Sequence, residues 1–242
     1  MPRLYDATKN KMKITTLLRE FSALFFPQIC VICNDKLLAQ EKIICLACLC
    51  KLPKTNNFNE PDNALEKLMA GRIPFERIAA FCIFAKKGTI APLIHHLKYR
   101  NRDDIGIFLG EMYGEELHGS AFLQPIDLIV PVPLHPKKRK QRGYNQAEMI
   151  AKGLSKITST PLSTNSLIRT IHNPTQTKFD KTRRWENVKD IFDVKNPETF
   201  EGKHILLVDD VITTGSTLEG CGVALQKCNN LKISILAIGQ AL

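Results

Sequence analysis

The sequence predicts an α/β fold with a parallel sheet, preceded by a small cysteine-rich module. From Arg77 onward, short apolar runs alternate with stretches of helical periodicity, as in sheets whose parallel strands are joined by crossover helices. Five of the eight cysteines lie between Cys30 and Cys50. The length of 242 residues corresponds to one domain of ~150 residues plus a small module.

The individual elements follow from apolar periodicity and from turn residues. Strands are expected at residues 78–84, 126–130, 165–169, 190–194, 205–208 and 233–238. Helices are expected at residues 91–101, 105–117, 147–154 and 216–227. In such sheets, ligands bind beyond the carboxyl ends of the strands, so polar residues that follow a strand are the first candidates for function.

Composition excludes several classes of protein. Apolar residues make up 44% of the chain and charged residues 24%, which argues against disorder and fibrous repeats. No apolar run approaches the ~18 residues of a spanning helix, and the N-terminal segment has no secretory-signal pattern, so a cytoplasmic location is expected. Both Met1 and Met12 remain candidate start sites.

The cysteines form two Cys-x-x-Cys pairs, Cys30 with Cys33 and Cys45 with Cys48, and Cys50 lies just beyond. This spacing is typical of structural zinc sites with four thiolate ligands. Disulfides are the alternative, but they suit oxidising compartments. Cys50 could replace Cys48 as a ligand. A closed site would stabilise the fold or bind a partner rather than perform chemistry.

A polar stretch after the cysteines, rich in Asn and Pro, reads as a linker. The predicted organisation is an N-terminal segment with the zinc module at residues 1–54, a linker at residues 55–76 and a larger domain at residues 77–242.

The most informative segment is 208–217, where a buried strand ends in Asp209 and Asp210 and a loop rich in Thr, Gly and Ser opens a helix. Backbone N–H groups at a helix start bind phosphate, and Gly215 allows close approach of the backbone. Two carboxylates beside such a loop suit a sugar phosphate. The alternative is a strand with exposed acids followed by an ordinary helix cap.

A basic run lies after the strand at 126–130. The formal net charge is +10, and no acid occurs between Asp127 and Glu148. The cations are Lys137, Lys138, Arg139, Lys140 and Arg142. Such a run binds polyanions or is a solvated loop.

Segment 208–217 resembles the 5-phosphoribosyl 1-diphosphate (PRPP) motif of type I phosphoribosyltransferases. Further segments resemble the ComF branch of that superfamily: residues 130–135, 142–147 and 93–99, the four-cysteine module, and Arg184 with Asn187. The stretch at 173–176 has Asn173 where the family usually has threonine. The resemblance implies a type I phosphoribosyltransferase-like fold after the zinc module, with PRPP bound together with Mg²⁺.

The resemblance also implies roles for individual residues. The PRPP-binding residues would be Asp209, Asp210, Val211, Thr213, Thr214, Gly215, Ser216 and Thr217. The pyrophosphate loop would be Pro133, Leu134 and His135, with the basic run neutralising the leaving group or binding DNA. Gln176, Arg184 and Asn187 would belong to a flexible loop that closes over the site. Tyr144 and Trp185 would stack on a base or anchor packing, while His95 and His96 are expected to be structural or exposed.

Two functions remain open. One is a ComF-type protein that binds PRPP and supports DNA uptake in natural transformation, handling single-stranded DNA with a helicase partner. The other is an active phosphoribosyltransferase with an unidentified acceptor. A PRPP-responsive transcription factor ranks last, since no helix-turn-helix pattern is apparent.

Overall fold

The computed structural model describes residues 27–170 and 191–241. The chain divides into two compact units, Met1–Lys51 and Leu52–Leu242, which are described separately. Within the described residues, no helix is long and apolar enough to cross a membrane.

The small unit contains the short helix α2 (Leu46–Cys50) and a tight turn between the first two cysteines. The turn is held by backbone hydrogen bonds from Cys30 N–H to the Asp35 carbonyl (2.8 Å) and from Asn34 N–H to the Cys30 carbonyl (2.9 Å). Among its described residues, the unit has few buried apolar side chains besides cysteines, namely Val31, Leu37, Ile43 and Ile44. A core of this size needs another source of stability, such as a metal site.

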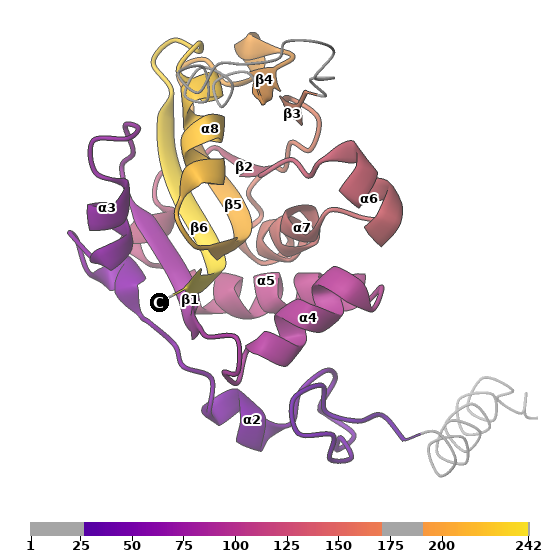
Figure 1. The fold of residues 1–242 in the computed structure, drawn as a ribbon. Helices are drawn as coiled ribbons and strands as arrows, with labels where there is room; N and C mark the ends of the chain where they lie inside the picture. The colour runs from indigo at the N-terminus through magenta and orange to yellow at the C-terminus, as the bar shows by residue number, and fades with distance from the viewer. Residues whose placement is uncertain (1–26, 171–190, 242) are drawn as a thin grey trace, which may run out of the picture. The chain divides into compact units, whose positions relative to one another are not determined.

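The large unit is built on a four-stranded parallel sheet, shown in Figure 1. Its strands, in spatial order, are β1 (Ile78–Phe84), β6 (Lys232–Ala241), β5 (His204–Ile212) and β2 (Leu128–Pro131). The parallel sheet expected from the sequence is therefore present. The strands β3 (Leu167–Arg169) and β4 (Phe192–Val194) were expected in that sheet but form a separate antiparallel pair.

Helices cover both faces of this sheet, because its strands are apolar along both faces. The core on one face joins Ile205 and Leu207 of β5 to Leu218 of α8 (Ser216–Leu225) and Leu65 of α3 (Ala64–Met69). Residues that alternate with these along β5 point to the other face. Three further helices pack together as a second helical layer: α4 (Ala91–Tyr99), α5 (Asp103–Leu117) and α7 (Gln146–Thr158). In Figure 1, α8 lies in front of β5 and β6.

Helices α5 and α7 pack in backbone contact. A Cβ atom placed on Gly110 would lie 2.1 Å from the Ile150 carbonyl oxygen, and one on Gly153 would lie 2.1 Å from the Ile107 carbonyl oxygen. Only glycine permits this approach, which fixes α7 against α5 and so fixes the segment that leads into α7.

Two segments differ from their predicted form. Residues 55–76, predicted as a linker, belong to the larger unit and contain a 3₁₀ turn (Asn57–Asn59) and α3. The Asn63 side chain caps α3 and also donates to the Ile78 carbonyl at 2.8 Å, so this segment is tied to β1. The basic run, for which a solvated loop was one alternative, forms the helix α6 (Pro136–Arg142). The other 3₁₀ turns among the described residues are Ala121–Leu123 and Pro197–Thr199.

Candidate functional site

The acid pair lies inside β5, although the sequence placed it just after the strand. The ladder with β6 continues past the pair to Ile212, which is opposite Gln240. Because side chains alternate along a strand, the two carboxylates leave β5 toward opposite faces. Both are half-buried, as is Val211. The structure thus places each acid in a different environment at the carboxyl end of β5.

Asp210 faces α4, where it meets Lys98. The Lys98 Nζ donates to Asp210 Oδ1 at 2.9 Å, and the two side chains are only 23% and 14% exposed. The sequence offered Lys98 as part of a family segment but gave it no role. Since the two residues lie 112 positions apart, their pairing could not be read from spacing.

Asp209 faces the opposite side of the sheet from Asp210, and its carboxyl group is perturbed by its surroundings. Burial and the neighbouring Asp210 carboxylate raise the pKa of Asp209 to about 7, although the Asp210 backbone N–H and Lys98 act to lower it. The Asp210 N–H donates to Asp209 Oδ1 at 2.8 Å. The pair therefore combines one carboxylate held by a lysine with one that exchanges a proton near neutral pH.

The loop between β5 and α8 exposes hydroxyl groups around an open helix start. Thr213, Thr214, Ser216 and Thr217 are exposed, and the Thr214 and Ser216 hydroxyls lie 3.0 Å apart. No side chain caps the first turn of α8 within the described residues. The N–H groups of that turn are therefore available to an anion, and the helix dipole favours negative charge there.

Gly215 allows this loop to turn. Its φ is +76°, and a Cβ atom there would lie 2.3 Å from Met69 Sδ and 3.0 Å from Arg72 Nη1. Both the conformation and the contact exclude a larger residue. Gly215 is buried, whereas the four hydroxyl residues around it face outward.

The support behind this loop comes from the predicted linker. Arg72 donates to the Thr214 carbonyl and to the Glu219 carboxylate, with Nη2 to Oε2 at 2.6 Å and Nε to Oε2 at 3.0 Å. One guanidinium therefore joins the loop to the first turn of α8. The polar composition of residues 55–76 gave no signal for this role.

The predicted pyrophosphate loop, Pro133 to His135, lies between β2 and α6 and is half-buried. His135 Nδ1 accepts from the Lys137 N–H at 3.1 Å and so caps α6. Asn145 Nδ2 donates to the Val132 carbonyl at 2.9 Å, while its Oδ1 caps α7. These bonds hold the loop at the carboxyl end of β2, the neighbour of β5.

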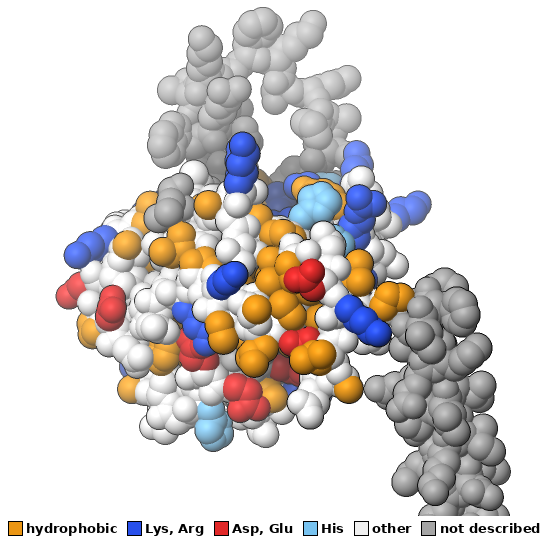
Figure 2. Space-filling model, turned by 90° about the horizontal axis from the view of Figure 1, so that it is seen from below, with side chains coloured by type: hydrophobic (Ala, Val, Ile, Leu, Met, Phe, Trp, Pro, Cys, Tyr) orange, Lys and Arg blue, Asp and Glu red, His pale blue; other side chains and the backbone are white. Residues whose placement is uncertain are grey.

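The basic run on α6 is exposed apart from Arg142, which is half-buried. Arg139 pairs with Glu148 at 3.0 Å, and Glu148 also pairs with Lys152 at 3.1 Å. Among the described residues, Lys137, Lys138, Lys140 and Arg142 form no ion pair. On the face shown in Figure 2, Lys and Arg side chains stand among hydrophobic and acidic ones, so the net positive charge is not uniform there.

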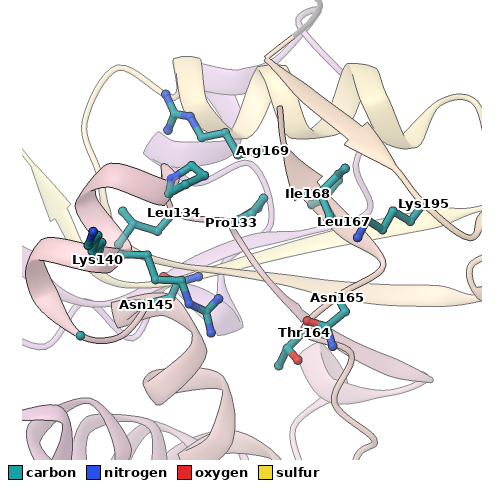
Figure 3. Close-up of a pocket in the computed structure, with 13 residues that line it drawn as sticks. Pro133, Leu134, Lys140, Asn145, Thr164, Asn165, Leu167, Ile168, Arg169 and Lys195 are labelled. Carbon is teal, nitrogen blue, oxygen red and sulfur yellow. The ribbon is translucent and has the colours of Figure 1, made fainter. Parts of the chain in front are cut away.

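A cavity of about 660 Å³ lies beside α6 and is lined by basic and neutral residues only. Lys140 and Leu134 on one side face Ile168 and Lys195 on the other, as Figure 3 shows. Arg169 lies at its edge, and its buried Nε has no hydrogen-bond partner among the described residues. The cavity suits an anion, but the acid pair and the loop at 213–217 do not line it.

The four predicted zinc ligands come together in the small unit. The sulfur atoms of Cys30, Cys33, Cys45 and Cys48 all lie within 4.8 Å of one another. Those of Cys33 and Cys45 are 3.6 Å apart, close to the ~3.8 Å edge of a sulfur tetrahedron around zinc. Cys50 is exposed and outside the cluster. The four-cysteine group can therefore bind a zinc ion.

Backbone donors support the thiolate form of Cys30. The Ile32 and Cys45 N–H groups each donate to Cys30 Sγ at 3.4 Å. Burial acts to raise the pKa of Cys30, but these donors and the Cys33 N–H outweigh it and lower the pKa to about 6. No cysteine of the described residues is in a disulfide, and Cys82, Cys221 and Cys228 are buried as expected.

The remaining predicted residues divide into two groups. Gln176, Arg184, Trp185 and Asn187 lie outside the described residues. Tyr144 acts as a packing anchor, because its hydroxyl donates to the Leu97 carbonyl at 2.6 Å and so fastens the end of α4. His95 is exposed and His96 half-buried.

Several known proteins are similar to this chain in sequence. Residues 145–238 match the phosphoribosyl transferase domain family. The chain is 31% identical over 193 residues to the DNA utilization protein YhgH of Escherichia coli K12, covering 78% of this chain and 80% of that protein. It is 41% identical over 91 residues to the competence protein ComFC of Bacillus subtilis, covering 38% and 35% of the two chains.

Among solved structures, the purine phosphoribosyltransferase of Pyrococcus horikoshii matches 57% of this chain and 73% of its own, at 19% identity and a TM-score of 0.33. The parallel sheet and the matched domain define a protein with a type I phosphoribosyltransferase fold and a small four-cysteine module. The chain belongs to the ComF family.

Proposed function

We propose that this ComF-family protein binds Mg²⁺-PRPP at the end of β5 and supports the uptake or use of DNA. In this proposal it handles single-stranded DNA with a helicase partner in the cytoplasm. The observation that carries the PRPP assignment is the loop at 213–217, where exposed hydroxyls surround an uncapped helix start beside two carboxylates.

Each part of the ligand has a matching group. The 5′-phosphate would accept hydrogen bonds from the N–H groups of the first turn of α8 and from the hydroxyls of residues 213–217. Asp209 and Asp210 would accept from the ribose hydroxyls. Magnesium would neutralise charge on the pyrophosphate. The loop at Pro133 to His135 would contact the pyrophosphate, since it follows β2, the strand next to β5.

The DNA role has two supports. The relatives named above are a DNA utilization protein and a competence protein. The cations of α6 that form no ion pair with a described residue, Lys137, Lys138, Lys140 and Arg142, are available to contact phosphates. Proteins that contact phosphates lose affinity steeply as salt rises, so the logarithm of the affinity for a single strand should fall linearly with the logarithm of salt concentration.

Calorimetric titration with Mg²⁺-PRPP tests the ligand assignment. We expect heat of binding for the wild-type protein and none for Asp209→Asn. Asp62→Asn is the matched control, because Asp62 is exposed and its positive φ of 59° suits asparagine. Equal heats for the wild type and Asp209→Asn would overturn the assignment.

Active phosphoribosyl transfer is a second candidate, favoured by the acid-free cavity that follows β2. In that reaction the bond from C1 of the ribose to the pyrophosphate oxygen breaks, its electron pair leaves with pyrophosphate, and a nucleophile bonds to C1. Arg139 and Lys140 line the cavity together with Pro133 and Leu134, where they could stabilise the departing charge. Release of pyrophosphate from PRPP with a panel of nucleobases would demonstrate transfer, and its absence would exclude transfer to those acceptors.

A further inference from the structure

A second cavity lies between the end of α4 and α6 and has a volume of about 540 Å³. Its lining includes Lys98, Tyr99, Lys138, Lys140 and Arg142, and none of its eight lining residues is acidic. The volume falls within the range of small-ligand sites. Cations without an acid in such a space favour a ligand that carries phosphate.

Tyr99 gives this cavity an aromatic wall. It is 64% exposed, the highest fraction among the large exposed hydrophobic residues that the structure describes in the larger unit. The Arg142 guanidinium lies 5.3 Å from the centroid of its ring, and the His95 ring lies 5.2 Å away. Proteins that bind single-stranded nucleic acids combine exposed aromatic rings with cations. The bases stack on the rings while the phosphates pair with the cations.

Three of the cations that line this cavity, Lys138, Lys140 and Arg142, lie on α6. Lys138 and Arg142 are four residues apart on one short helix, so their like charges repel each other. Neither has an acidic partner among the described residues. Arg142 is positioned instead by a hydrogen bond to Gln146 Oε1 at 2.7 Å, which holds its guanidinium near the ring.

We infer that this cavity, the α4–α6 cavity, binds a nucleotide unit of single-stranded DNA, with a base stacked on Tyr99 and the phosphates beside Lys138 and Lys140. The inference rests on the proposed handling of single-stranded DNA and locates it. Bases of a duplex are covered by their neighbours, so the ring selects the single strand.

The test measures fluorescence anisotropy of a labelled oligothymidylate and of an abasic strand of equal length. For Tyr99→Ala, we expect affinity for oligothymidylate to fall roughly tenfold, as loss of one stacked base predicts, and affinity for the abasic strand to stay unchanged. Tyr99→Phe keeps the ring and should retain wild-type affinity for both strands. Because Tyr99 is exposed, neither substitution should disturb the core. Circular dichroism of each variant checks that it is folded.

The outcomes separate this inference from the function it rests on. If the wild type binds oligothymidylate and Tyr99→Ala binds it equally well, the α4–α6 cavity is not the base site and the DNA role stands. A wild type that binds the abasic strand as tightly as oligothymidylate also overturns base stacking. A wild type that binds neither strand contradicts the DNA role itself, whereas the PRPP titration is unaffected by all of these results.

Discussion

Lys98 of α4 and Asp210 of β5 form an ion pair in which both side chains are largely shielded from solvent. Lys98 also lines the α4–α6 cavity. One ammonium group therefore lies between the acid pair and the cavity that we assign to DNA. A ligand that engages Asp210 competes with Lys98 for that carboxylate, so the two sites share a charged group.

Replacing Lys98 with methionine should destabilise the protein, because the shielded Asp210 carboxylate loses its partner. We expect the free energy of unfolding to fall by about 2 kcal/mol, measured by urea denaturation. Lys227→Met is the matched control. Lys227 also pairs with an aspartate at 2.8 Å, but the two side chains are 62% and 46% exposed, so the expected loss is below about 1 kcal/mol. Similar losses in both variants would contradict this account of Asp210.

Asp209 should make stability depend on pH. Its pKa of about 7 in the folded protein lies above the ordinary value of 3.8, so between these values the folded state binds more protons than the unfolded state. Stability from this group is therefore lost as pH rises from about 4 to 7. Asp209→Asn removes this titration. As pH rises over that range, the stability of the variant relative to the wild type should therefore increase, by ~1.4 kcal/mol at most for each unit by which the pKa of Asp209 is raised. Thermal melts from about pH 4 to about pH 8 measure the difference, and a constant difference would rule out the raised pKa.

The loop at 213–217 should not tolerate a side chain at Gly215. Gly215→Ala adds a Cβ atom against Met69 and Arg72 and also strains the positive φ, so we expect a loss of roughly 2 to 4 kcal/mol in stability. Gly119→Ala separates the two effects, because Gly119 has a similar φ of +74° and no atom within 4 Å of an added Cβ. Its loss should be near 1 kcal/mol. If chemical denaturation gives equal losses, the contact with Met69 and Arg72 contributes nothing.

The zinc assignment predicts one metal ion per chain bound by four named cysteines. Cys48→Ser should lower the zinc content measured by elemental analysis, whereas Cys50→Ser should leave it unchanged, because Cys50 lies outside the cluster. Removal of zinc by a chelator should unfold the small unit, since its core is small. Full zinc content in Cys48→Ser would argue for a different ligand set.

The sequence predicts those elements that have a strong apolar pattern. Strand β1 was predicted with its observed bounds, Ile78–Phe84, because its side chains are nearly all buried. Strand β5 was predicted too short, since its apolar pattern stops at Val208 while its backbone ladder continues to Ile212. Helix α6 has no buried residue, so the sequence shows no apolar periodicity that would predict it.

The sequence predicts the segments that form the site but not the side-chain contacts between them. The acid pair and the loop at 213–217 are contiguous, and a contiguous segment can be recognised without knowledge of the fold. The Lys98 contact with Asp210 and the Arg72 contact with Glu219 join residues more than 100 positions apart. Such pairs depend on the strand order, which the sequence pattern does not specify.

The capping of α3 by Asn63 and the contact of Arg72 with the loop have a practical consequence for the design of shorter fragments. A fragment that starts at Arg77, where the alternating pattern begins, would lose Leu65, Met69 and Ile73, which belong to the same core as β1. It would also leave Glu219 without its guanidinium partner. A start at Leu52 retains every described residue of the larger unit. Crystallisation or binding trials without the cysteine module should therefore use that earlier boundary.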